Sequence, residues 1–441
     1  MYEGKARILV ENRDARRIVA SAARISTTQG TALTVYERSG DGEKDIRLIR
    51  KVLSSGHKSV LEHQNVSIAF DNVSVLAEQF MIEHRLASYT VKSRRYVDHA
   101  GAGYVIPDGM DGALKEAYCA GMDRLFALYA KLEEAGVPKE DARFVLPYSF
   151  RSNFYMTLNA RELVRLISEM LFGRAAHVSE LRNLGEQLAA QMERNYPGVL
   201  EAESKRVPEC AAKSVSAAIE DPHAATGKAR LLSLGDDPAG SLAEAMAFSG
   251  RFEPVDGEYV CDRNMLKLAR DARPRELEFI SARFRVEDVS LASVTHFTRH
   301  RVLSLLTPDV SRGLTGGAYV VPDSIRKSPE LLEQYEQAFA EQKNLAERLL
   351  GMGMDERQLG YLALAGHMVD LLLEMNGREL LHFLKLRTCN RAQWEIRALA
   401  RQMLDQLRGK YEEIFWVYGP SCLVEGRCPE GKLSCGHPVT R

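Results

Sequence analysis

The sequence predicts an α+β protein made of two tandem copies of one fold, in which an antiparallel sheet is combined with long helices. Two observations lead to this prediction. Short phrases recur in the same order at nearly one spacing, and both halves mix period-2 strand patterns with long helical patterns. Because the repeat period is far longer than that of a solenoid unit, it indicates a duplicated domain.

Four pairs of phrases carry the duplication. In order along the chain, the pairs are Lys5–Leu9 with Lys228–Leu232 (offset 228−5 = 223), His84 with His300 (300−84 = 216), Gly103–Pro107 with Ala318–Pro322 (318−103 = 215), and Asn159–Leu163 with Asn376–Leu380 (376−159 = 217). Chance similarity could explain one such phrase, but it does not explain four in register.

Within each copy, apolar and polar residues alternate near Val66–Phe70 and Phe279–Val286, and this pattern predicts strands. Helical patterns cover Ser74–Ser88, Gly112–Ala135 and Leu158–Met192 in the first half, and Ser290–Leu306, Ser328–Gly351 and Leu371–Leu407 in the second. Prolines and poor apolar periodicity around Pro197–Thr226 indicate a linker. We therefore predict copy one at residues 1–200, a linker at 201–226, copy two at 227–415 and a cysteine-containing tail at 416–441.

The composition is that of an ordinary globular protein. Its 441 residues are enough for two domains, and 45% are hydrophobic. Lys+Arg (59) and Asp+Glu (60) nearly cancel to a net charge of -1, which argues against general nucleic-acid or membrane binding. The beginning of the chain lacks a signal-peptide layout, and seven cysteines, four of them scattered, favour a reducing compartment. We predict a cytoplasmic location.

The most informative tripeptide is Arg299-His300-Arg301, which has a damaged counterpart in Glu83-His84-Arg85. Two arginines beside a histidine supply planar donors suited to phosphate or to an anionic flavin. The alternative is a solvated charged turn. The long ordered context and the second occurrence favour a binding function.

Three phrases resemble the flavin-dependent thymidylate synthases (ThyX): His57–His63, Arg299–Ser304, and the late stretch from Asn376 to Arg397. The resemblance covers nearly the whole chain, twice. It implies that the protein methylates C5 of dUMP, with methylenetetrahydrofolate as carbon donor and NADPH-reduced FAD as hydride source. The family works without a cysteine nucleophile and forms homotetramers with sites between subunits. A tandem chain would then be a homodimer that forms a pseudo-tetramer.

The resemblance also assigns residues. FAD contacts fall on Ser59, Arg299, His300, Arg301, Asn376, Arg378 and His382. Nucleotide contacts fall on Ser93, Arg94, Arg95, Arg143, His296, Arg299 and Arg387. Arg387 matches the arginine credited with ionising uracil N3. A fixed cation beside N3 and O4 favours the anionic ring as C5 becomes nucleophilic. No metal site is predicted.

Neither copy keeps the whole set of site residues. Copy one has Glu83 in place of the first arginine and Met170 in place of Arg387. Copy two lacks the Ser-x-Arg-Tyr phrase of residues 93–96, and it has Gly360 in the register position of Arg143. Because the losses are complementary, we predict one composite site between unlike copies and an inactive reciprocal site.

Several alternatives stay open. Thr90 and Val91 replace an Asn-Glu pair of the family, and His296 replaces a glutamine, so another uridine nucleotide could be the substrate. A non-catalytic flavin- or nucleotide-binding protein is also compatible with two incomplete copies. Four of the assigned positions also have a simpler structural interpretation. Ser59 could be a packed small hydroxyl, His382 a surface histidine, residues 93–96 an exposed basic loop and Arg387 a charge on a helix surface. The tail residues Cys422, Cys428, Cys435 and His437 could bind zinc or form a covering segment.

Overall fold

The computed structural model describes residues 3–194, 199–200 and 218–439. Most of the predicted linker, residues 201–217, lies outside the described part. The chain forms two compact units, which we call unit 1 (Met1–Ile219 with Ser328–Leu364) and unit 2 (Glu220–Lys327 with Ala365–Arg441). Among the described residues, no helix is long and apolar enough to cross a membrane.

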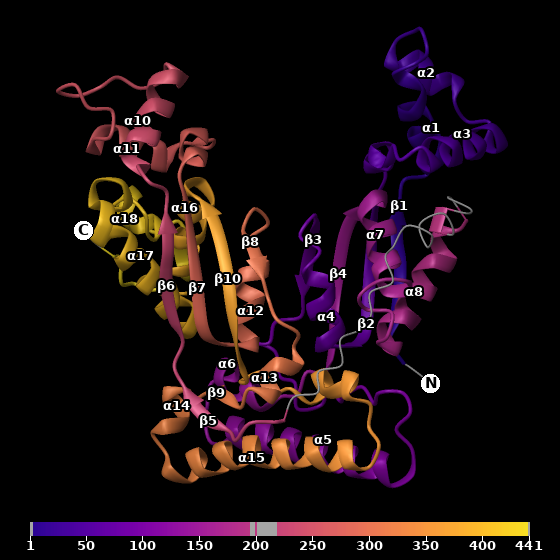
Figure 1. The fold of residues 1–441 in the computed structure, drawn as a ribbon, viewed down its shortest axis with the longest axis vertical. Coiled ribbons are helices and arrows are strands. Elements are labelled where there is room, and N and C mark those ends of the chain that lie inside the picture. The colour runs from indigo at the N-terminus through magenta and orange to yellow at the C-terminus, as the bar shows by residue number, and fades with distance from the viewer. Residues whose placement is uncertain (1–2, 195–198, 201–217, 440–441) are drawn as a thin grey trace. The chain divides into compact units, whose positions relative to one another are not determined.

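Unit 1 contains a four-stranded antiparallel sheet in the order β1-β2-β4-β3 (Figure 1). Its strands are β1 (Lys5–Glu11), β2 (Asn65–Ser74), β3 (Ala87–Val91) and β4 (Arg151–Asn159). The unit's helices and 3-10 turns are α1 (Ala15–Ile25), α2 (Ala32–Arg38), α3 (Gly42–Ser54), η1 (Lys58–His63), α4 (Val75–Ile82), α5 (Gly112–Glu134), α6 (Lys139–Ala142), η2 (Arg143–Val145), α7 (Ala160–Leu171), α8 (Ser179–Met192), α15 (Pro329–Gly351) and η4 (Glu356–Leu362). A hydrophobic core joins the inner side of the sheet to α1, α3, α7 and α8.

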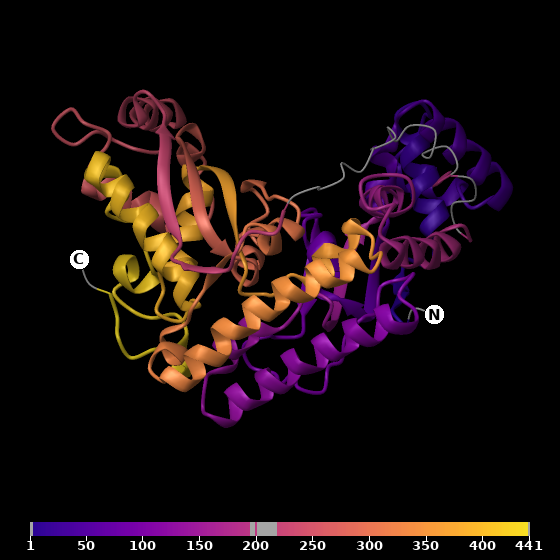
Figure 2. The same cartoon turned by 60° about the horizontal axis from the view of Figure 1, so that its bottom comes forward.

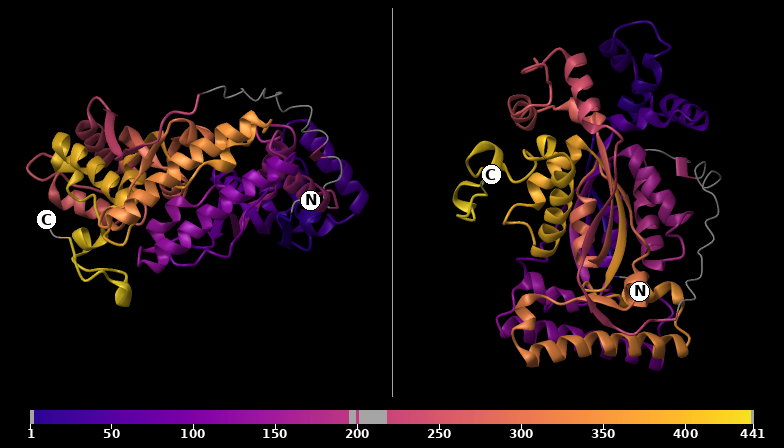
Figure 3. Two further views of the ribbon diagram at one scale, coloured as in Figure 1. Left: turned by 90° about the horizontal axis from the view of Figure 1, so that it is seen from below. Right: turned by 60° about the vertical axis from the view of Figure 1, so that its left-hand side comes forward.

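Unit 2 repeats this sheet in the order β6-β7-β10-β8. Its strands are β5 (His223–Ala225), β6 (Lys228–Leu234), β7 (Ser281–Ser290), β8 (Ser304–Leu306), β9 (Ala318–Val320) and β10 (Met368–Asn376). Its helices and turns are α10 (Pro238–Ser249), α11 (Asp262–Arg270), η3 (Arg275–Phe279), α12 (Leu291–Thr298), α13 (Ser311–Thr315), α14 (Asp323–Arg326), α16 (Gly377–Arg387), α17 (Trp394–Phe415), α18 (Ser421–Glu425) and η5 (Gly431–Leu433). Helix α17 lies along β6 (Figure 3).

The duplication extends to backbone detail. The bulge of β2 contains Asn72 at φ 55°, and the equivalent bulge of β7 contains Asp288 at φ 52°. Asn and Asp tolerate this left-handed conformation better than most residues. The predicted α+β fold and its tandem repetition are therefore confirmed, down to one sheet order used twice.

The edge strands β1 and β6 are also treated alike. Gln187 and Gln191 of α8 hydrogen-bond the backbone of β1, and Gln402 and Gln406 of α17 do the same for β6. Side-chain amides thereby satisfy edge groups that would otherwise be open to another strand.

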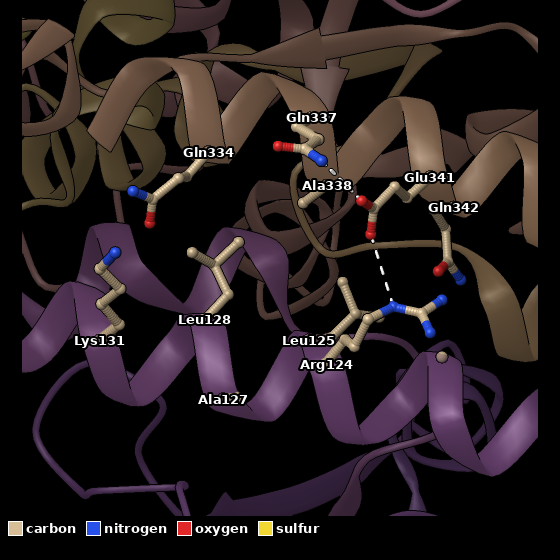
Figure 4. A pocket seen from close by; sticks show the side chains of 11 residues that line it. Arg124, Leu125, Ala127, Leu128, Lys131, Gln334, Gln337, Ala338, Glu341 and Gln342 are labelled. Carbon is tan, nitrogen blue, oxygen red and sulfur yellow. Dashed lines mark hydrogen bonds and ion pairs between the residues drawn. The ribbon is translucent and has the colours of Figure 1, made fainter. Parts of the chain in front are cut away.

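Helices α5 and α15 come from different copies but pack side by side within unit 1 (Figures 1 and 2). Leu345 fills the space above Gly121, where a Cβ would lie 2.2 Å from its methyl group. Arg124 and Glu341 form an ion pair at 3.5 Å beside a cleft of about 310 Å³ (Figure 4). Repeated phrases identify equivalent segments, but they do not tell which of them pack together.

The predicted helix limits need correction. The stretches 158–192 and 371–407 begin within strands β4 and β10, and each contains two helices separated by a loop. The stretches 74–88 and 290–306 contain short helices that are followed by β3 and β8. In β4, burial alternates along the strand up to Leu158, and the amphipathic pattern of α7 begins directly afterwards. Because the two periods adjoin without a break, periodicity alone does not mark where the strand ends and the helix begins.

Candidate functional site

In unit 2, the predicted residues His296, His300 and Arg387 meet where the C-terminal end of α12 lies against α16. His300 is 2% exposed, and its Nδ1 lies 2.8 Å from Glu379 Oε1. On the other side of the ring, Arg387 Nε donates to His300 Nε2 at 3.1 Å, and Arg387 Nη2 donates to the backbone oxygen of His296 at 3.1 Å. The half-buried guanidinium of Arg387 is thus held at two points.

These bonds define the protonation of His300. Arginine can donate but cannot accept, so His300 Nε2 must present its lone pair and the ring proton must sit on Nδ1, facing the carboxylate. Burial lowers the pKa of His300, and Arg387 and His382 act in the same direction against the opposing effect of Glu379. His300 is therefore neutral at pH 7.

The remaining predicted residues of copy two surround this centre. Arg299 and Arg301 are exposed on either side of His300, and the His382 ring lies 5.4 Å from the His300 ring. Arg378 forms an ion pair with Glu278 at 2.6 Å. Asn376 caps α16, because its side chain accepts from the backbone N–H of Glu379 at 2.9 Å.

In unit 1, a second predicted group gathers around Glu140 of α6. Arg95 Nε lies 2.6 Å from Glu140 Oε2, and Arg143 Nε donates to the Glu140 backbone oxygen at 3.1 Å. Ser93 Oγ accepts from the Arg95 backbone N–H at 3.2 Å and so shapes the turn. The structure therefore brings Ser93, Arg95 and Arg143 together.

Arg94 and Ser59 are placed differently. The Arg94 guanidinium is buried in an ion pair with Glu78 at 2.6 Å, and Ser152 donates to the other oxygen of that carboxylate. This pair holds the loop to the end of the sheet. Ser59 is exposed on η1, so a buried packing role does not apply to it.

Comparisons with known proteins identify the family of this chain. The family model described as "Thymidylate synthase complementing protein" matches residues 7–198 and 232–411. The chain belongs to this family. The two matched segments confirm both the predicted family and its tandem occurrence.

Curated relatives include the flavin-dependent thymidylate synthases of Sulfolobus acidocaldarius, 30% identical over 195 residues (44% of this chain and 74% of the relative), and of Geobacter sulfurreducens, 35% identical over 164 residues (36% and 70%). Similar solved structures include the UMP/dUMP methylase PolB of Streptomyces cacaoi bound with 5-Br dUMP (24% identity, 46% of this chain and 97% of that chain, TM-score 0.39). Another is ThyX of Helicobacter pylori with FAD and dUMP (22% identity, 45% and 99%, TM-score 0.36).

Copy one arranges the equivalent of the His300 site as a closed ionic network. His84 Nε2 lies 3.7 Å from Glu169, while Arg174 pairs with Glu83 at 2.9 Å and with Glu169 at 3.1 Å. Met170, the counterpart of Arg387, is fully buried in the core. Burial lowers the pKa of His84 to about 4.

The C-terminal tail contacts the end of α16 and the following loop. Lys385 pairs with Glu425 at 3.1 Å, and Asn390 donates to the backbone oxygen of His437 at 3.2 Å. Among the described residues, His, Cys, Asp and Glu side chains form no group of three placed to hold a metal ion. The observed contacts are those of a covering segment.

Sequence reasoning missed the carboxylates that organise both groups, namely Glu379 and Glu140. A signal existed for Glu379, because it belongs to the repeated Asn-x-Arg-Glu-Leu phrase and has Glu162 as its counterpart. Glu140 lies outside the quoted phrases, and its role follows from tertiary contacts alone.

Proposed function

We propose that this chain is an FAD-dependent thymidylate synthase that methylates C5 of dUMP at a composite site between unlike copies. Methylenetetrahydrofolate would supply the carbon, and NADPH would reduce the FAD. The observation that carries the proposal is the orientation of Arg387 by a neutral, buried His300. Family membership and the relatives named flavin-dependent thymidylate synthases support the same chemistry.

Arg387 would act on the uracil ring directly. Its guanidinium is a planar donor held in place by His300 and the His296 backbone, and such a donor can face N3 and O4 together. Stabilising negative charge on that edge makes C5 a better nucleophile, because the cation favours the ionised ring. The fixed orientation matters because a preorganised cation does not have to reorient during the reaction.

The donor set around Arg387 suits FAD. Arg299 and Arg301 are exposed cations, and His382 and Arg378 lie along α16, where nine residues (387−378) span roughly 13 Å at the rise of an α-helix. An extended, anionic dinucleotide can contact cationic donors spread over such a length. FAD, when bound, would supply the hydride that completes the methyl group.

Copy one would provide the nucleotide-phosphate half. Arg95 pairs with the Glu140 carboxylate, Arg143 donates to the Glu140 backbone oxygen, and Ser93 accepts from the Arg95 backbone. A phosphate could compete with the Glu140 carboxylate for Arg95. Because copy two lacks these residues and copy one lacks Arg387, each live site would draw on both copies. Two chains would then form a pseudo-tetramer with two live sites, and we expect a cytoplasmic enzyme.

The second candidate is methylation of another uridine nucleotide. Thr90 and Val91, which replace the family's Asn-Glu pair, are paired into the sheet opposite Tyr155 and Phe154. His296 is buried at the end of α12 and replaces a glutamine. These replacements change side chains at positions that the resemblance places beside the nucleotide.

The proposal is tested with the purified full chain. The flavin spectrum is recorded first, and product formation is then measured with dUMP, and in parallel with UMP, in the presence of methylenetetrahydrofolate and NADPH. Arg387→Ala and Arg143→Ala should each lower turnover strongly, whereas Arg348→Ala, at an exposed position of α15, should leave it unchanged. Bound flavin with activity on UMP alone would favour the second candidate. Neither flavin nor turnover would favour a non-catalytic protein.

A further inference from the structure

We propose that Glu379 and His300 act as a positioning pair that sets the guanidinium of Arg387 through one fixed imidazole tautomer. The catalytic consequence of this pair rests on the proposed function, whereas its geometry does not. Glu379 has no assigned role in the resemblance described above. It would determine how well Arg387 is aimed without touching the nucleotide.

The argument begins with the direction of the hydrogen bonds. The three groups form a line from Glu379 Oε1 to His300 Nδ1 (2.8 Å) and from His300 Nε2 to Arg387 Nε (3.1 Å). Arg387 can approach Nε2 in this way only when that nitrogen carries no proton. A carboxylate facing Nδ1 favours the tautomer that leaves Nε2 free, because Nδ1 must then donate.

The surroundings of His300 hold the ring in place. The ring of Phe383 packs edge-on at 4.9 Å, and Phe383 in turn stacks on Phe297 of α12 at 5.7 Å. In the part of the chain that the structure describes, the titratable and charged groups that act on His300 are Glu379, His382 and Arg387, all on α16. A protonated His300 would present a donor to Arg387 and would release it.

Copy one supplies a natural control. Glu162, the counterpart of Glu379 (379−162 = 217), receives the same capping geometry, because its backbone N–H donates to Asn159. There, however, His84 faces Glu169 at 3.7 Å, and Met170 takes the place of Arg387. Both copies therefore carry the carboxylate. In copy two the histidine can orient Arg387, whereas copy one has a methionine at that position.

The direct test is the protonation state of the ring. The ligand-free full chain, labelled with 15N-histidine, is studied at pH 7.5 by long-range 1H–15N correlation, with the His300 signals assigned from the spectrum of His300→Gln. We expect a neutral ring with its proton on Nδ1. Glu379→Ala should mix or reverse the tautomers. Glu379→Gln should keep the Nδ1–H form, because the amide oxygen can still accept.

Kinetics tests the consequence. Glu379→Ala should lower kcat with dUMP by roughly 10- to 100-fold, the size of effect expected when a catalytic group is misplaced by about 1 Å. Glu379→Gln should recover most of the loss, and Glu162→Ala should behave as wild type. A merely structural role would instead lower stability in both alanine variants and leave the Gln and Ala variants of Glu379 alike.

The outcomes separate the two proposals. A proton on Nε2 of wild-type His300, or a doubly protonated ring at pH 7.5, overturns the positioning pair. An unchanged Nδ1–H tautomer in Glu379→Ala overturns it as well. If the tautomers behave as expected but wild type forms no methylated nucleotide, the pair stands and the proposed function fails. If Glu379→Ala fails to fold, the position of the His300 proton in the wild type and in Glu379→Gln still tests the positioning pair.

Discussion

His300 and His84 are equivalent residues of the two copies, yet their surroundings differ in one decisive respect. In unit 2, His300 accepts from Arg387, a half-buried cation at the end of α16. In unit 1, Met170 is buried where Arg387 would be, and His84 lies beside Glu169 in a network closed by Arg174 and Glu83. One fold can therefore place a half-buried arginine beside the histidine in one copy and use the same position for internal packing in the other.

The comparison also shows how the loss in copy one is stabilised. Replacing the first arginine by Glu83 would leave a carboxylate near Glu169, and like charges repel. Arg174 lies within 3.1 Å of both acids and compensates them. Copy one therefore differs from copy two by more than the loss of an arginine, because Arg174 pairs there with both acidic side chains.

The largest expected effect comes from making copy two resemble copy one. Arg387→Met removes the proposed cation, and losing one preorganised charge-stabilising group typically lowers kcat by roughly 10²- to 10³-fold. Because Arg387 is half-buried at the end of a helix, the melting temperature should change little. Single-turnover formation of thymidylate measures the effect. Activity within twofold of wild type would show that Arg387 does not act on the substrate.

His300, Arg387 and Glu379 show which features of the site can be predicted from the sequence and which cannot. The quoted phrases predicted the duplication and the family, and they assigned Arg299 and Arg387 to the same half-site. They did not predict the hydrogen bond between His300 and Arg387, which are 387−300 = 87 residues apart. They could not predict that Glu379 faces His300 or that Glu140 joins Arg95 to Arg143, because a carboxylate's partner depends on tertiary contacts. They also could not predict that residues 328–364 belong to unit 1, since a repeat shows equivalence but not packing.

The second prediction concerns Met170, the residue of copy one that is equivalent to Arg387. Met170→Ala should reduce the free energy of unfolding by about 2–5 kcal/mol, because Met170 is fully buried against Gly185 and a cavity would remain. Urea denaturation measures this loss. Since Met170 has no proposed ligand contact, dUMP affinity should stay at the wild-type value below the unfolding transition. Weaker dUMP binding by the folded variant would mean that copy one keeps a nucleotide site there.

The third effect concerns pH. His84 has a folded-state pKa of about 4 against an ordinary value of 6.5, so the unfolded chain takes up the proton first. Stability should therefore fall as the pH drops from 6.5 and level off below about 4. The shift corresponds to roughly 3 kcal/mol from this group. Urea midpoints of wild type and His84→Gln between pH 7 and 4 test it. Equal pH slopes for the two proteins would contradict the prediction.

The smallest effect concerns the pairing of unlike copies. Arg124 and Glu341 occupy equivalent positions (341−124 = 217) but carry opposite charges and pair at 3.5 Å. Arg124→Glu should lower stability by about 1 kcal/mol or less, because the pair is exposed. The double variant Arg124→Glu/Glu341→Arg should restore it, as melting temperatures would show. Failure of the double variant to recover would mean that the charges do not interact.

The central claim is that one nucleotide site draws on both copies. Calorimetric titration of the full chain with dUMP tests it most directly, with Arg387→Met and Arg143→Ala compared against wild type. We expect one dUMP per chain in wild type, with binding lost or strongly weakened in each variant, although the two arginines belong to different copies. Two dUMP molecules per chain, or variants that each lose half of the sites, would contradict the composite site.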